Sequence, residues 1–421
     1  MNASADAMNA LFILIALPAL VLGQLAFAAA QRQDAQGPPA HSPVQAVQAE
    51  TSFELNGNKV YVPVRVNGSG PYWFLLDSGS ISNVVDTETA KNVGIAVDKS
   101  FETRGAGEKS MAGAVGSAVS LEVAGLEFAQ PQVDVLPISV AISAAEGRPV
   151  NGLLGYQFFD HFVVQIDYVR RQLQIFQPAS FRYNGAGESI PLEIVRGNIL
   201  IATSLTMPDG KRRPGKFLVD TGWRSALTFN APFAASRHLA AIASKTVDAV
   251  TGMGIGGPTV DTIARIPSLS LGRYTIDNFV GNFSHAKSGV LSQTDFAGII
   301  GAEILRRFTV IFDYPHRRMI LEPNSTFPAP YEFDMSGLFI TSPGGSGKEF
   351  TIYGVIENSS AMQAGIRADD VIEAIDGRPA SSFSLEQVRQ LFKGPEGQEH
   401  ALTIRRNGKD FTVKLQLRKI I

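Results

Sequence analysis

The sequence predicts a mainly β protein, and three observations support this fold class. Apolar runs recur along most of the chain and are separated by clusters of Gly, Pro and Asn, which is typical of strands joined by turns. Long helical periods are scarce. An apolar strand that ends in Asp-Ser/Thr-Gly occurs twice, once at Asp77-Ser78-Gly79 and once at Asp220-Thr221-Gly222. The body of the protein is therefore expected to be all-β.

The repeat extends well beyond the two aspartates. Each aspartate is followed by the same two elements, an apolar-apolar-Gly segment and an Asp-Tyr pair: residues 151–155 and 167–168 in the first copy, and 297–301 and 313–314 in the second. A repeat of this length is much longer than those of solenoid proteins. We therefore expect two homologous lobes, at residues 51–183 and 184–325, produced by an internal duplication.

These paired motifs resemble the retropepsin-like aspartic proteases, here with both lobes in one chain. The resemblance covers residues 52–325 and includes Leu153-Leu154-Gly155 and Ile299-Ile300-Gly301. It implies two β-barrel lobes that face each other and bring Asp77 and Asp220 together as a catalytic dyad. It also implies a supporting role for the residues around the dyad, which are Ser78, Gly79, Ser80, Thr221 and Gly222.

Two adjacent carboxylates can cleave a peptide bond without a cofactor. Because two like charges cannot both ionise readily, the pair retains one proton. The ionised member can then activate water while the protonated member polarises the substrate carbonyl. The chain has no cysteine and its six histidines form no His-x-x-x-His pair, so a thiol nucleophile and a zinc site are not expected. We predict neither a cofactor nor a metal. A net charge of −2 also gives no indication of nucleic-acid binding.

Glycine-rich segments follow each Asp turn, and by position they resemble the flaps that close over substrate in this family. Small residues suit a lid that must open and let a substrate backbone approach closely. Trp223 breaks the symmetry, because it stands where Ser80 stands in the first copy, and its bulk could shape the cleft. The expected flap and cleft residues are Gly105, Ala106, Gly107, Gly252, Met253, Gly254 and Trp223.

The N-terminal segment is expected to direct export. Residues 11–30 are apolar and end in small residues, so residues 1–30 are interpreted as a signal peptide, or alternatively as a membrane anchor. Residues 31–50, rich in Gln, Ala and Pro, are expected to be a flexible linker. The predicted location is the bacterial periplasm, either free or tethered to the inner membrane.

Residues 332–421 resemble the PDZ domains of bacterial proteases. The resemblance rests on Ala364-Gly365-Ile366, Asp370-Val371-Ile372 and Ile375-Asp376-Gly377. It implies a groove that binds a peptide C-terminus as an added strand. The expected peptide-binding residues are Gly337, Leu338, Phe339, Ile340 and Val388.

The sequence therefore predicts an aspartic endopeptidase that hydrolyses extended polypeptides and recognises a peptide tail through its PDZ domain. One alternative is a non-catalytic peptide-binding protein that uses the cleft and the PDZ groove as two recognition sites. A second alternative, a sugar- or lipid-processing hydrolase on a similar β scaffold, has no motif of its own in the sequence.

Overall fold

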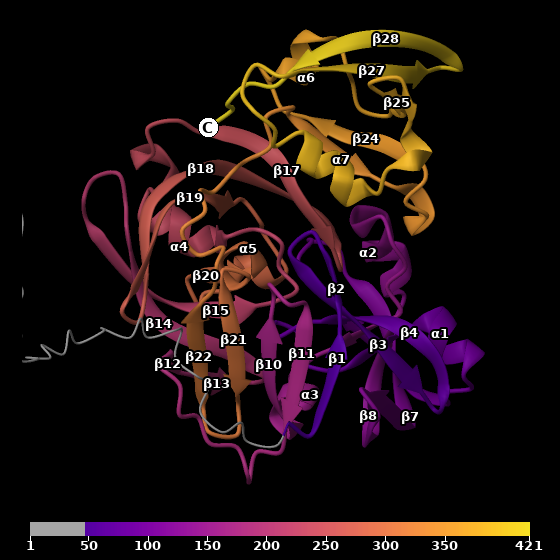
Figure 1. The fold of residues 1–421 in the computed structure, drawn as a ribbon, viewed down its shortest axis with the longest axis vertical. Coiled ribbons are helices and arrows are strands. Elements are labelled where there is room, and N and C mark those ends of the chain that lie inside the picture. The colour runs from indigo at the N-terminus through magenta and orange to yellow at the C-terminus, as the bar shows by residue number, and fades with distance from the viewer. Residues whose placement is uncertain (1–46) are drawn as a thin grey trace, which may run out of the picture. The chain divides into compact units, whose positions relative to one another are not determined.

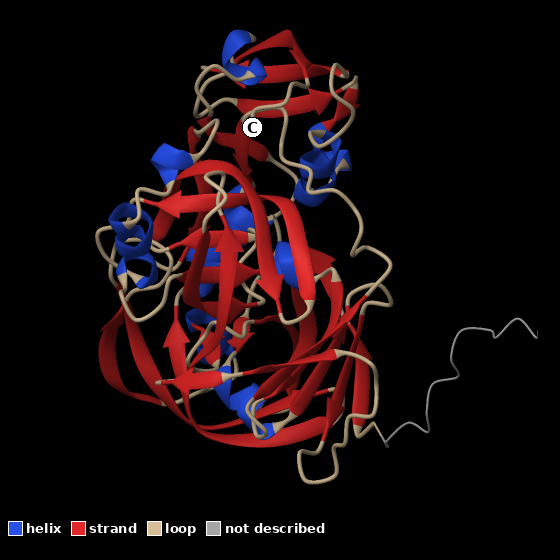
Figure 2. Ribbon diagram, turned by 90° about the vertical axis from the view of Figure 1, so that its left-hand side faces the viewer, coloured by secondary structure: helices blue, strands red, loops and turns tan. Residues whose placement is uncertain are grey.

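The computed structural model describes residues 47–421 (Figure 1). Strands account for 48% of the structure and helices for 14%, which confirms the mainly β prediction (Figure 2). Residues 1–30 and most of the predicted linker lie outside the described residues. The linker prediction extends too far, because β1 (Ala49–Ser52) already pairs with a strand of the body. Among the described residues, no helix is long and apolar enough to cross a membrane.

The first half of the body contains an eight-stranded sheet. In spatial order its strands are β2 (Glu54–Asn56), β3 (Lys59–Val66), β4 (Ser69–Leu76), β9 (Gly152–Leu154), β5 (Val84–Asp86), β8 (Leu126–Leu136), β7 (Met111–Val123) and β6 (Val97–Thr103). Three helices accompany this sheet: α1 (Thr87–Asn92), α2 (Ile138–Glu146) and α3 (Tyr156–His161). The order brings β9 back between β4 and β5, so that it pairs parallel with β4.

A second eight-stranded sheet has the same strand order. Its strands are β13 (Glu193–Val195), β14 (Asn198–Thr206), β15 (Arg212–Asp220), β20 (Gly298–Gly301), β16 (Leu227–Phe229), β19 (Tyr274–Ser284), β18 (Gly257–Leu271) and β17 (Val247–Gly254). It is accompanied by α4 (Ala231–Ser236) and α5 (Ala302–Leu305). Even the additional pairing of the first sheet, β3 with β7, recurs as β14 with β18. Two stretches of different sequence thus adopt one topology.

A six-stranded sheet joins the two halves. Its order is β1, β11 (Gln172–Phe176), β10 (Val163–Asp167), β21 (Phe308–Asp313), β22 (Arg318–Pro323) and β12 (Glu188–Pro191), so each half supplies three strands. The halves meet where β10 pairs antiparallel with β21, with Val164 opposite Phe312. The main hydrophobic core includes side chains from both halves. Because this pairing and core are shared, neither half is packed independently of the other.

The C-terminal module has its own core. Its main sheet runs β23 (Leu338–Thr341), β24 (Phe350–Val355), β25 (Val371–Ile375), β27 (Glu399–Arg406) and β28 (Lys409–Gln416), and β26 (Arg378–Pro379) pairs with β25. Two helices, α6 (Ser360–Gln363) and α7 (Leu385–Leu391), complete the module. Strand β23 lies at the edge of the sheet and pairs on one side only, with β24.

Candidate active site

The two aspartates lie at the ends of equivalent strands. Asp77 directly follows β4, and Asp220 is the last residue of β15. Each strand pairs parallel with the glycine-containing strand of its own half, with Leu76 opposite Leu154 and Asp220 opposite Gly301. The N–H of Asp77 donates to the carbonyl of Leu154 at 2.9 Å. The pairing of these strands therefore fixes the backbone position from which each aspartate side chain extends.

Reciprocal hydrogen bonds tie the two Asp turns together. The N–H of Ser78 donates to Thr221 Oγ1 at 3.0 Å, and the N–H of Thr221 donates to Ser78 Oγ at 3.0 Å. Each hydroxyl also donates to a carbonyl in the other half, Ser78 Oγ to Val219 at 2.9 Å and Thr221 Oγ1 to Leu76 at 2.6 Å. Both hydroxyl residues are fully buried. In such a setting every unpaired polar group would be costly, so these four bonds hold the turns in one geometry.

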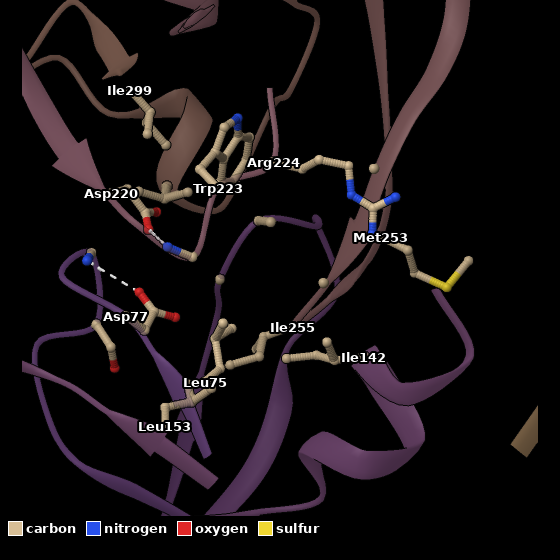
Figure 3. Close-up of a pocket in the computed structure, with 18 of the residues that line it drawn as sticks. Leu75, Asp77, Ile142, Leu153, Asp220, Trp223, Arg224, Met253, Ile255 and Ile299 are labelled. Carbon is tan, nitrogen blue, oxygen red and sulfur yellow. Dashed lines mark hydrogen bonds between the residues drawn. The ribbon is translucent and has the colours of Figure 1, made fainter. Parts of the chain in front are cut away.

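The glycines of the turns bring the carboxylates close together. Gly79 donates its N–H to Asp77 Oδ1 at 3.1 Å, and Gly222 donates to Asp220 Oδ1 at 2.7 Å (Figure 3). Each glycine also lies against the opposite aspartate: a Cβ at Gly222 would be 2.7 Å from Asp77 Cγ, and one at Gly79 would collide with the Asp220 carboxyl. Any larger residue in either turn would push the two carboxylates apart.

The environment favours a single proton on the pair. Burial raises the pKa of Asp77, and the positive charge of Lys59 opposes this rise. Burial also raises the pKa of Asp220 well above its ordinary value, and the negative charge of Asp77 raises it further. Desolvation and like-charge repulsion act in the same direction on Asp220. We therefore treat the two groups as one coupled acid, with a proton retained above the usual range of a carboxyl.

A cavity of about 480 Å³ opens over the aspartates. Both carboxylates line it, together with the sequence-predicted residues Gly105, Ala106, Gly252, Met253, Gly254 and Trp223 (Figure 3). The β6–β7 and β17–β18 hairpins meet at their tips, where Gly107 donates to the carbonyl of Ile255 at 2.9 Å and Lys109 to that of Gly256 at 3.0 Å. In this structure the two glycine-rich hairpins are therefore bonded to each other.

The two residues that follow the Asp turns make different contacts. Ser80 does not direct its hydroxyl to the Asp77 carboxylate, but donates it to the carbonyl of Ser82 at 2.8 Å. The indole N–H of Trp223 donates to Thr228 Oγ1 at 2.9 Å, while the ring lies beside Asp220 (Figure 3). Trp223 thus has a structural partner and also forms part of the cavity wall.

Sequence reasoning missed a charged cluster beside the aspartates. Glu146, at the end of α2, is 1% exposed and accepts hydrogen bonds from Lys59 at 2.8 Å, Tyr61 at 2.8 Å and Arg224 at 2.9 Å. The charges of Arg224 and Lys59 overcome the effect of burial and lower the pKa of Glu146. Lys59, Glu146 and Arg224 all line the same cavity as the aspartates. The sequence signal for this cluster was Lys59 at the start of a strand, and lysines in such positions are too common to indicate a functional site.

A second cavity, of about 400 Å³, lies between β23 and α7 of the C-terminal module and the body of the protein, where β17 contributes Asp248, Ala249, Val250 and Thr251. Of the residues predicted to bind a peptide, Leu338, Phe339 and Ile340 line this cavity, whereas Gly337 and Val388 do not. Val388 is fully buried in the core of the module. The N–H of Gly337 donates to Asp334 Oδ1 at 2.7 Å, so the chain itself already supplies this group with a carboxylate.

The end of α2 contacts the module around this cavity. Arg389 Nη2 of α7 donates to the carbonyl of Ala145 at 2.6 Å, and the N–H of Ser342 donates to the carbonyl of Ala144 at 2.7 Å. Ile142, Ala145 and Glu146 of the same helix line the cavity over the aspartates. Helix α2 is therefore a wall of the first cavity and a contact surface for the C-terminal module.

We expect Thr221→Val to lower the free energy of unfolding by about 2–4 kcal/mol. The substitution preserves shape but leaves the N–H of Ser78 and the carbonyl of Leu76 buried without their partner. Urea denaturation would measure the loss, with Thr275→Val on an exposed position of β19 as the matched control. Equal stability of the two variants would show that the reciprocal bonds contribute nothing.

The raised pKa values predict a dependence of stability on pH. The ordinary pKa of an aspartate is 3.8, and that of Asp220 is higher in the fold. The protonated group therefore contributes stability that is fully present below its unfolded pKa and is lost as pH rises through its folded pKa. As pH rises from about 4 to 7, we expect the free energy of unfolding to fall less steeply in Asp220→Asn than in the native protein. The control is Asp160→Asn, at an exposed position. If the free energy of unfolding of Asp220→Asn depends on pH in the same way as that of the native protein, Asp77 and Asp220 do not share a proton.

Among residues 47–421, no group of three or more His, Asp or Glu side chains is placed to hold a metal ion. None of the histidines in this part of the chain lines the cavity over the aspartates. The polar side chains that line the cavity over the aspartates thus include carboxylates, hydroxyls and cationic groups.

Comparisons with known proteins match two parts of the chain. Residues 62–158 match the family model "Aspartyl protease", and residues 351–406 match the family model "PDZ domain". The periplasmic serine endoprotease DegP of Salmonella typhimurium is 43% identical over 65 residues, which are 15% of this chain and 14% of DegP. A probable CtpA-like serine protease of Staphylococcus haemolyticus is 34% identical over 73 residues, or 17% of this chain and 15% of that protein. These matches span only about one seventh of the relatives' length. Residues 62–158 are thus similar to an aspartyl protease domain, and residues 351–406 to a PDZ domain.

Proposed function

We propose that this protein is an aspartic endopeptidase that hydrolyses peptide bonds in extended polypeptides. The observation that carries the proposal is the pair of cross-linked turns, in which each glycine lies against the other turn's aspartate. Such an arrangement holds two carboxylates at one place in a cavity large enough for several substrate residues. Asp77 and Asp220 are the proposed catalytic residues, and Ser78, Gly79, Thr221 and Gly222 position them.

The proposed mechanism uses water and one shared proton. A polypeptide lies in the cavity with its scissile carbonyl beside the pair. The ionised carboxylate takes a proton from water as the water oxygen bonds to the carbonyl carbon, and the protonated carboxyl gives its proton to the carbonyl oxygen. The tetrahedral intermediate then collapses: as the C–N bond breaks, one carboxyl gives its proton to the amine nitrogen, and the other carboxylate takes a proton from a hydroxyl of the intermediate. A carboxylic acid and an amine leave, and the pair again holds one proton. The glycine-rich hairpins must open to admit the chain and close to exclude water.

The relatives named above are serine proteases, so the catalytic type needs a physical argument. A serine nucleophile requires an adjacent base, most often histidine. No histidine of residues 47–421 lines the cavity, whereas the adjacent carboxylates of Asp77 and Asp220 do. These features favour the aspartic type.

The proposal includes an origin by duplication and a domain division. The identical strand order of the two eight-stranded sheets supports two homologous lobes, at residues 51–183 and 184–325. The PDZ domain would extend over residues 332–421 and dock a peptide tail along the free edge of β23. We also propose export to the periplasm, based on the predicted signal segment and on the periplasmic location in the name of the DegP relatives.

One observation favours the alternative of a non-catalytic peptide-binding protein. The bulky Trp223 forms part of the cavity wall beside Asp220, at the position that Ser80 occupies after the first Asp turn. A protein that only binds peptides would retain the cavity but would not depend on the charge state of either aspartate.

We expect Asp77→Asn and Asp220→Asn each to reduce cleavage of an unfolded protein by about 1,000-fold or more, because each removes one member of the acid–base pair. Product formation would be followed by mass spectrometry between about pH 3 and 8, where a shared proton gives a bell-shaped profile. Asp160→Asn serves as the exposed control. Full activity in either dyad variant, or inhibition by a serine-directed covalent reagent, would contradict the aspartic mechanism.

If the native protein shows no cleavage at any pH, a transition-state mimic separates the two functions. A peptide with a secondary alcohol in place of the scissile amide should bind a working pair far more tightly than the parent peptide. Equal affinities would identify a binding protein.

A further inference from the structure

The cavity over the aspartates and the cavity of the PDZ domain share one wall. Five residues line both of them: Arg224, Ser225, Thr251, Phe339 and Arg389. Arg224 follows the Asp220 turn by two residues, and Arg389 belongs to α7 of the PDZ domain. A peptide bound in either cavity therefore comes within reach of these two guanidinium groups.

The cations at this junction are unequally paired with carboxylates. Three cations, Lys59, Arg224 and Arg389, meet two carboxylates, Glu146 and Glu386. Glu146 already accepts from Lys59 at 2.8 Å and from Arg224 at 2.9 Å, and the backbone N–H of Gly57 donates to Glu386 Oε2 at 3.1 Å. Neither carboxylate makes a salt bridge with Arg389. Lys59 and Arg224 thus share Glu146, and Arg389 has no direct carboxylate partner among residues 47–421.

Arg389 also has an unused hydrogen-bond donor. Its Nη2 donates to the carbonyls of Ala145 at 2.6 Å and Ile340 at 3.2 Å, whereas its Nη1 is buried and has no hydrogen-bond partner among residues 47–421. Burial and the positive charge of Arg224 together lower the pKa of Arg389 to about 9, although the charges of Glu146 and Glu386 oppose this shift. A buried guanidinium without an anion is unfavourable, and its planar donors match a carboxylate.

We propose that Arg389 and Arg224 form a subsite for one carboxylate of a bound peptide, at the junction of the two cavities. The peptide chemistry rests on the proposed function, but the charge preference does not depend on cleavage. The carboxylate comes either from an acidic side chain or from the chain terminus. The site is distinct from the Gly337 loop, where the N–H of Gly337 already binds Asp334. The PDZ domain would thus contribute directly to substrate selection in the catalytic cavity.

Binding to the Asp77→Asn variant tests this subsite without requiring catalysis. Fluorescence anisotropy would compare extended peptides that differ by one Glu→Gln change at successive positions, and each peptide as its free acid and its terminal amide. We expect one carboxylate, at one position or at the terminus, to tighten binding about tenfold. The free acid and amide arms distinguish the terminus from a side chain. No preference for any carboxylate would refute the subsite, whereas failed cleavage by the native protein would refute only the proposed function.

Arg389→Met in the same background should abolish the preference. The readout is the ratio of the affinities for acidic and neutral peptides, which we expect to fall to about one. Arg405→Met, which removes an exposed arginine of the same domain, is the matched control. Glu386→Gln should act in the opposite sense and increase the preference, because it removes a competing carboxylate. Equal weakening of acidic and neutral peptides by Arg389→Met would show that Arg389 only attaches the PDZ domain to Ala145, and would overturn the proposal.

Discussion

The hydrogen bonds between Ser78 and Thr221 join two turns that are 143 residues apart in the chain. Each turn carries an aspartate that is expensive to bury, and each glycine next to it faces the aspartate of the other turn. Without the four bonds the buried carboxylates would be free to separate, because their mutual repulsion and desolvation both oppose the close arrangement. The shared β10–β21 pairing and the common core supply the stability that this unfavourable contact requires.

A second set of contacts extends from the site into the C-terminal module. Helix α2 presents Ile142 and Ala145 to the cavity, while its last carbonyls accept hydrogen bonds from Ser342 and Arg389. Glu146 of this helix holds Lys59, whose charge opposes the rise in the pKa of both aspartates. A movement of the C-terminal module would therefore displace helix α2 and the Glu146–Lys59 ion pair, and so change the electrostatic environment of the two aspartates.

The sequence allowed prediction of what is encoded locally and repeated. The Asp turns, their glycine-containing partner strands and the glycine-rich hairpins each have a short motif, and the two copies reinforce one another. Contacts between distant residues outside the repeated motifs were not predictable: Glu146 and Lys59 are 87 residues apart, and Gly57 and Glu386 are 329 apart. Helix α2 was also missed, since its Ile and Val content is equally typical of a strand. Val388 was assigned to the peptide groove because helical spacing alone does not separate a groove from a core.

The central claim is that the two aspartates hold one proton between them. Titration of isotope-labelled aspartate carboxyls by NMR would measure this directly in the intact protein. The account predicts that one carboxyl of the pair keeps its proton well above the ordinary pKa of 3.8, and that this behaviour disappears when the other aspartate is replaced. Two carboxyls that titrate independently near their ordinary value would contradict it.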